Sequence, residues 1–188
     1  MKKLLAIALI AMMAVPAMAA VGWFNDYILV SDNGAADSYY WIGADPTYGT
    51  QFNGATFSIT LGETLELGAD MAYWADGGDN RGGGAFYWTV NNYANVQEVI
   101  WTQSGPVGND YLGSQATTIN IAQGLPVGNY TLIVWAKSWG DAGGDSWLNN
   151  GGANYSANFN VQAVPEPATM SLLGLGALAM VLRRKIRK

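Results

Sequence analysis

The stretch Asn154-Tyr155-Ser156-Ala157-Asn158-Phe159-Asn160-Val161-Gln162 decides the fold class. Its apolar residues Tyr155, Ala157, Phe159 and Val161 alternate strictly with serine and asparagine. Successive side chains of a β-strand point to opposite faces of the sheet. The stretch therefore predicts a strand with one buried face and one wet face lined by asparagine.

The chain between its N-terminal and C-terminal segments also predicts β-strands. Glycine and asparagine interrupt it every 8 to 15 residues, and no helical period is sustained. Residues 130–137, Tyr-Thr-Leu-Ile-Val-Trp-Ala-Lys, are more continuously apolar and predict a central strand. Four tryptophans lie within predicted strands and are expected in the core: Trp41, Trp88, Trp101 and Trp135. The predicted strands are 27–31, 39–42, 55–60, 64–67, 71–75, 85–91, 97–102, 117–122, 130–137 and 154–162.

A turn motif favours a particular architecture. Leu125, Gly128 and Tyr130 precede and open the central strand at a spacing that resembles the tyrosine corner of Greek-key sandwiches. In that corner the hydroxyl bonds back to the backbone and fixes the arch between sheets. The alternative is a tight turn followed by an ordinary strand tyrosine. The predicted fold is all-β, a two-sheet β-sandwich of immunoglobulin-like or jelly-roll type.

The N-terminus has the organisation of an export signal. Lys2 and Lys3 form a basic start, residues 4–15 are apolar, and Ala17 and Ala19 frame a small-x-small cleavage site. We expect a signal helix over residues 1–19 that is removed during Sec-type export. The alternative is an uncleaved membrane anchor.

The C-terminus combines three features in a fixed order. A motif of Pro165, Glu166 and Pro167 is followed by an uncharged apolar run over 168–182 and then by a basic cluster. A helix over that run spans roughly 22 Å, somewhat less than a bilayer core. We expect a transmembrane helix whose basic cluster stays cytoplasmic. The cluster consists of Arg183, Arg184, Lys185, Arg187 and Lys188.

This order resembles the PEP-CTERM sorting signal of exported bacterial proteins, which a membrane-embedded exosortase is thought to recognise and cut. The resemblance covers residues 164–188 only. It implies an inner-membrane-tethered precursor that is processed and delivered to the cell envelope or extracellular matrix. It also implies an association with exopolysaccharide production. The alternative for this tail is a plain anchor that is never cut.

Between the two signals lies one domain, residues 20–163, of unusual composition. Arg81 and Lys137 are its only basic residues against 13 acids, a net charge of −11 where the whole chain has −5. A surface of this charge repels phosphate backbones, so nucleic acid binding is not expected. The chain has no cysteine and no histidine, which excludes disulfides, Ser-His-Asp or Cys-His catalysis, and zinc sites built from these residues.

Two glycine-rich loops carry carboxylates that are candidates for calcium. The predicted ligands are Asp76 and Asp79 in one loop and Asp141 and Asp145 in the other. Glycine lets a loop fold tightly enough for oxygen ligands to converge on this cation, but neither loop has the spacing of an EF-hand. The alternative is that Asp, Asn and Gly form solvated turns.

Tryptophans flank the same loops. Trp74, Trp139 and Trp147 are candidates for glycan binding, because an indole face stacks on the apolar face of a sugar ring while nearby polar groups take its hydroxyls. The alternative is that these rings pack in the core or anchor the loops.

Together these features predict an exported, non-catalytic surface or matrix protein that binds exopolysaccharide. The alternative is a glycoside hydrolase or lyase that uses carboxylates, for which Glu63, Glu66 and Glu98 are the only glutamates of the domain. A retaining hydrolase requires two carboxyl groups about 5 Å apart, and nothing in their spacing demands that.

Overall fold

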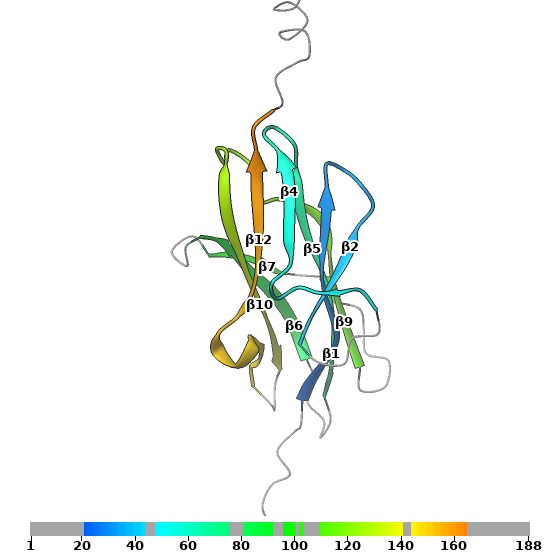
Figure 1. Ribbon diagram of the computed structural model, residues 1–188. Helices are drawn as coiled ribbons and strands as arrows, with labels where there is room; N and C mark the ends of the chain where they lie inside the picture. Colours follow the sequence, from blue (N-terminus) through cyan, green and yellow to red (C-terminus); the bar gives the residue numbers. More distant parts are fainter. Residues whose placement is uncertain are drawn as a thin grey trace, which may run out of the picture.

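The protein folds into a sandwich of two mixed β-sheets (Figure 1). The structure is a computed structural model, which describes residues 21–43, 48–75, 81–91, 96–100, 102–103, 110–140 and 144–164. This confirms the predicted all-β, two-sheet sandwich. The predicted signal helix and transmembrane helix lie outside the described residues. Among those that are described, no helix is long and apolar enough to cross a membrane.

The first sheet, sheet A, has the strand order β3-β2-β1-β5-β9-β8. Its neighbours are antiparallel except for β2 and β3, which run parallel. The strands are β1 (Val21–Asp32), β2 (Ser38–Ile42), β3 (Thr50–Gln51), β5 (Leu65–Ala75), β8 (Thr102–Gln103) and β9 (Asp110–Asn120).

The second sheet, sheet B, has the order β4-β12-β10-β6-β7. Strand β12 pairs with β4 in parallel, and β11 pairs with β10 beyond the end of β12. A short 3-10 helix (Asn150–Gly152) joins β11 to β12. The strands are β4 (Thr56–Thr60), β6 (Arg81–Val90), β7 (Gln97–Ile100), β10 (Gly128–Gly140), β11 (Ser146–Leu148) and β12 (Tyr155–Gln162).

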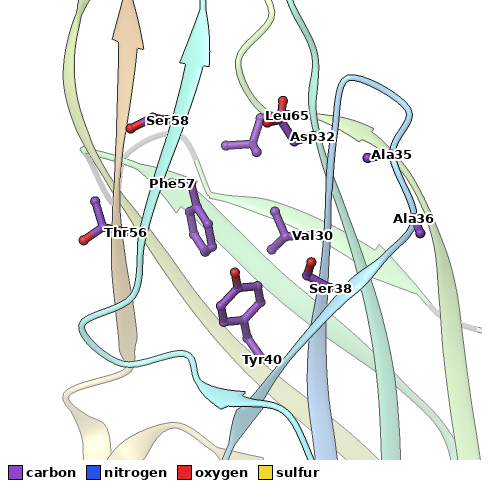
Figure 2. A pocket seen from close by; sticks show the side chains of 10 residues that line it. All are labelled: Val30, Asp32, Ala35, Ala36, Ser38, Tyr40, Thr56, Phe57, Ser58 and Leu65. Atoms are coloured by element: carbon purple, nitrogen blue, oxygen red, sulfur yellow. The ribbon is translucent and has the colours of Figure 1, made fainter.

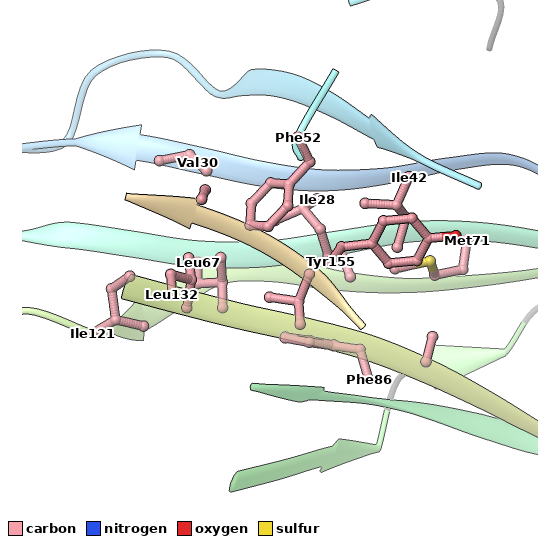
Figure 3. Close-up of a cluster of buried hydrophobic side chains, with 14 of the residues drawn as sticks. Ile28, Val30, Ile42, Phe52, Leu67, Met71, Phe86, Ile121, Leu132 and Tyr155 are labelled. Carbon is pink, nitrogen blue, oxygen red and sulfur yellow. The ribbon is translucent and has the colours of Figure 1, made fainter. Parts of the chain in front are cut away.

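The core lies between the sheets and is apolar (Figure 3). Sheet A contributes Ile28 and Met71, and sheet B contributes Phe86 and Leu132, all of them fully buried. Burying one such side chain stabilises the fold by about 1.5–3 kcal/mol. Strand β12 shows the predicted alternation, since its tyrosine, alanine, phenylalanine and valine are buried and its serine and asparagines are not.

Several predicted strands are wrong in their boundaries. The predicted strands 27–31 and 117–122 begin too late, since β1 starts at Val21 and β9 at Asp110. Residues 64–67 and 71–75 form the single strand β5, which runs through Gly68. A Cβ atom at Gly68 would lie 2.6 Å from the carbonyl oxygen of Gln115. Glycine at this position therefore lets the backbone of β9 come close to β5 where the register between the two strands shifts. Residues 97–102 form no single strand, because β7 pairs with β6 in sheet B whereas β8 pairs with β9 in sheet A.

The predicted tyrosine corner is present. The hydroxyl of Tyr130 donates a hydrogen bond to the carbonyl oxygen of Pro126, 2.8 Å away. Its ring stacks on Phe159 with the centroids 5.1 Å apart. The turn that leads into β10 is therefore tied to the strand by its own first tyrosine.

A carboxyl group is buried at a β-bulge. The pairing of β1 with β5 shifts between Phe24 and Tyr27, and Asp26 within this bulge is 1% exposed. Its Oδ1 accepts a hydrogen bond from the backbone N–H of Ala72 at 3.0 Å. Its Oδ2 has no hydrogen-bond partner in the described part of the chain. Burial raises the pKa of Asp26 to about 8, partly opposed by the bond from Ala72, and the charge of Asp70 raises it further.

We predict that Asp26 makes the fold less stable as the pH rises. The folded protein keeps the proton up to about pH 8, whereas the carboxyl group ionises near pH 3.8 in the unfolded chain. The free energy of unfolding therefore falls between these values by about 1.4 kcal/mol per pH unit and levels off above them. Asp26→Asn should raise the stability at pH 8 by about 2–5 kcal/mol and flatten the profile, as measured by urea unfolding from pH 4 to 9.

The matched control is Asp110→Asn, which removes an exposed carboxylate at the start of β9. It should leave the slope of the profile unchanged. An Asp26→Asn profile as steep as that of the unmodified chain would contradict the buried, protonated carboxyl group.

Tyr130→Phe should destabilise the protein by about 1 kcal/mol, because it removes one hydrogen bond and keeps the ring that stacks on Phe159. Urea unfolding would measure this loss. An unchanged midpoint would show that the corner adds nothing to stability, and Tyr130→Ala, which also removes the stacking, should cost more.

Candidate functional site

The outer face of sheet B is built by the alternation of β10. Leu132, Val134 and Ala136 are fully buried against the core. The residues between them therefore point away from the core, and among these Trp135 and Lys137 are only partly buried. The expectation that Trp135 belongs to the core is wrong. Residues 132–135 are continuously apolar because the outer face of the strand carries aromatic rings of its own.

Three rings form this cluster, which we call the aromatic platform: Tyr87 of β6, Trp135 of β10 and Trp147 of β11. Tyr87 lies opposite Trp135 in the register and stacks on it, with ring centroids 5.5 Å apart and planes 9° apart. Tyr87 also contacts Trp147 at 6.1 Å and 31°. Such pairs add about 0.5–1.5 kcal/mol beyond the area they bury. Trp147 remains 47% exposed, so part of the platform faces solvent.

Lys137 contacts both Trp147 of the platform and Asp145. Its Nζ lies 5.1 Å from the centroid of the Trp147 ring and 2.8 Å from Oδ2 of Asp145. Lys137 stands opposite Trp147 in the pairing of β10 with β11. The indole of Trp147 therefore extends across the ammonium group of Lys137 toward Tyr87 of β6. The same ammonium group holds both this ring and the carboxylate of Asp145.

A second carboxylate borders the platform on β7. The hydroxyl of Tyr87 donates a 2.7 Å hydrogen bond to Oε1 of Glu98. Desolvation first, then this bond and the charges of Glu98 and Asp145, raise the pKa of Tyr87 to about 12. The phenol is therefore a neutral donor at any physiological pH.

A row of polar side chains continues the same face along β10 and β12, and we call it the amide row: Asn129, Thr131, Asn158 and Asn160. Asn160 donates to Oδ1 of Asn129 at 2.6 Å, and Thr131 donates to Oδ1 of Asn158 at 3.2 Å. These residues line a shallow hollow of about 230 Å³ together with Thr56. The amide row offers both donors and acceptors without a formal charge.

The structure separates the three predicted glycan-binding tryptophans. Trp147 belongs to the platform. Trp139 lies on the same sheet and covers Gly83 of β6, where an added Cβ atom would come within 2.9 Å of its ring. Trp74 lies in sheet A, with its indole against Gly22 of β1. Trp74 is therefore not brought together with the other two.

A second hollow opens between β2 of sheet A and the edge strand β4 of sheet B (Figure 2). It has a volume of about 250 Å³ and an apolar floor that includes Val30 and Phe57. Ser38, Ser58 and Asp32 place polar groups at its rim. Burial, together with the charge of Glu63, raises the pKa of Asp32. No sequence pattern predicted this hollow, because its lining combines β4 of sheet B with strands of sheet A.

The candidate calcium ligands are only partly described. Asp76, Asp79 and Asp141 lie outside the described residues, and Asp145 pairs with Lys137. Among the residues that are described, no group of three or more acids could hold a metal ion. Calcium binding by the two loops stays a prediction.

The glutamates of the domain lie on different elements. Glu63 accepts a hydrogen bond from the backbone N–H of Thr60 in the turn between β4 and β5. Glu66 lies on β5 of sheet A, and Glu98 lies on β7 of sheet B. The Oε1 of Glu98 is occupied by the hydroxyl of Tyr87. The geometry thus assigns Glu98 to the border of the platform.

We predict that Glu98→Gln lowers the pKa of Tyr87, because it removes a negative charge that stabilises the protonated phenol. Titration of tyrosine absorbance in the full chain would show one group ionising earlier than in the unmodified protein. Glu66→Gln, a change in the other sheet, is the control that should leave the curve unchanged. Identical curves for Glu98→Gln and the unmodified chain would contradict the assigned hydrogen bond.

Comparison with known proteins bears on the tail alone. No curated protein matches the chain. Residues 163–185 match the family model of the PEP-CTERM protein-sorting motif, which confirms the resemblance drawn from Pro165, Glu166 and Pro167. The match implies exosortase as the processing partner and supports an exported protein associated with the cell envelope. The C-terminal tail of this chain is thus similar to a PEP-CTERM sorting signal.

Proposed function

We propose that the protein is a non-catalytic surface or extracellular-matrix protein whose β-sandwich binds exopolysaccharide through the outer face of sheet B. The observation that supports this proposal is the aromatic platform. Trp147 keeps nearly half of its surface exposed there, beside the paired side chains of Lys137 and Asp145. Ring faces bordered by hydrogen-bonding groups suit the apolar faces and hydroxyls of sugars.

The proposal includes the export and processing of the protein. The leader, residues 1–19, directs Sec-type export and is removed after Ala19. The apolar segment 168–182 holds the precursor in the inner membrane, and the basic cluster from Arg183 to Lys188 stays in the cytoplasm. Exosortase then cuts near Pro165, which delivers the domain to the envelope or the matrix.

The absence of catalysis is part of the proposal. Glu98 is engaged by Tyr87 and stands in a different sheet from Glu66. Incubation of the full chain with a bound polysaccharide should release no reducing ends or unsaturated products. Release that is lost in Glu98→Gln would instead support the hydrolase or lyase alternative.

The platform can be tested by one substitution and a matched control. Trp147→Ala should weaken binding to an exopolysaccharide at least tenfold, because it removes the most exposed ring of the platform. Trp41→Ala, which removes a partly buried indole of sheet A, should bind like the unmodified chain. A glycan array identifies the ligand, and affinity electrophoresis of the full chain measures both variants.

The folded state of each variant is checked by its urea midpoint before binding is compared. Equal losses in Trp147→Ala and Trp41→Ala would contradict a binding site on sheet B. Failure of the unmodified chain to bind any polysaccharide would remove the binding function and leave a structural role.

A further inference from the structure

From the charges and the length of the outer face of sheet B, we infer that its ligand is a neutral, extended polysaccharide that lies along β10 from the aromatic platform to the amide row. This inference rests on the proposed function and adds the chemical class of the ligand and the direction of the chain.

The first step is the charge of the platform. Lys137 is one of only two basic residues between the leader and the tail, and its ammonium group is already paired with Asp145. The carboxylate of Glu98 borders the other side of the platform and accepts a hydrogen bond from the hydroxyl of Tyr87. A uronate or sulfate group placed on these rings would meet carboxylates and would need to displace Asp145 to reach a cation.

The second step is the charge of the whole domain. Residues 20–163 carry a net charge of −11, which repels an anionic polymer before it makes any contact. A neutral polymer is not repelled by this charge. Its approach and its affinity should therefore depend little on salt.

The third step is the chemistry of the amide row. Asn129 and Asn160 bond to each other, as do Thr131 and Asn158, so these side chains are held in place before a ligand arrives. Amides and hydroxyls of this kind exchange hydrogen bonds with sugar hydroxyls and have no preference for an anion. The hollow of about 230 Å³ in their midst provides a recess for part of a sugar ring.

The last step is the length of the face. Asn129 and Lys137 lie on one strand, and the separation along it is roughly 27 Å at about 3.4 Å per residue. The platform and the amide row therefore bind different rings of the same chain. Long polymers gain from both contacts, whereas a single sugar reaches only one of them.

The experiment is affinity electrophoresis of the full chain in a detergent without a sugar headgroup. The neutral probes are hydroxyethylcellulose, mannan and dextran, and the anionic probes are alginate and polygalacturonate. We expect retardation by at least one neutral polymer, with less than a twofold change between 20 and 300 mM salt, and none by the anionic polymers. Oligosaccharides of two units should compete at least tenfold more weakly than long ones.

Two variants separate the charge argument from the binding argument. Asp145→Asn frees Lys137 but leaves a strongly negative domain, so retardation by alginate should stay far weaker than retardation by the neutral polymer and should disappear in 300 mM salt. Asn158→Ala, at the far end of the face, should weaken binding of the long neutral polymer at least threefold without affecting competition by two-unit sugars. Trp41→Ala again serves as the control.

The outcomes are distinct. Binding to anionic polymers alone would overturn the inference and leave the proposed function standing. Equal competition by short and long neutral sugars would overturn the extended binding mode. No binding to any of the five polymers would overturn the inference, and the glycan array decides whether the proposed function falls with it.

Discussion

The alternation of one strand governs the arrangement of sheet B. Strand β10 pairs with β6, β11 and β12, so its two faces set the orientation of all of them. Leu132, Val134 and Ala136 face the core, where their full burial is favourable. Trp135 and Lys137 are then forced outward. The exposed aromatic cluster is therefore a consequence of the same period of two that builds the core.

The sandwich is held together without disulfide bonds, since the chain has no cysteine. Side-chain hydrogen bonds stabilise two of its irregular points. At the bulge of β1, the amide of Ala72 bonds to the carboxyl group of Asp26, and at the turn before β10, the hydroxyl of Tyr130 bonds to Pro126. The acceptor of the first bond is a buried acid, whose tendency to ionise opposes folding at neutral pH.

Local pattern predicted much of the fold, and long-range pairing limited the rest. The alternation in β12 and the corner at Tyr130 are properties of neighbouring residues, and both were predicted correctly. The break placed at Gly68 was wrong because this glycine serves the approach of β9, which lies some fifty residues away in the chain. The division of residues 97–102 between two sheets likewise depends on partners that no local pattern identifies.

The candidate site followed the same rule. Trp147 was predicted from its position beside a loop, but Tyr87 and Glu98 were not, because only the pairing of β6 with β7 and β10 brings them to it. Trp135 could have been assigned from sequence. It alternates with Val134 and Ala136, so a strict period of two places it outside the core. Its tryptophan side chain suggested burial, and the pattern was the better guide.

The direction of β12 determines where the end of the described chain lies relative to the aromatic platform. Val161 stands opposite Gly128, and the described chain leaves the sandwich at Val164 (Figure 1). Lys137 lies nine residues along β10 from Gly128, roughly 30 Å away at about 3.4 Å per residue. Val164, where the described chain ends, and the platform therefore lie at opposite ends of the domain. A cut beyond Val164 would leave the geometry of the exposed rings intact, because these rings lie at the other end of β10.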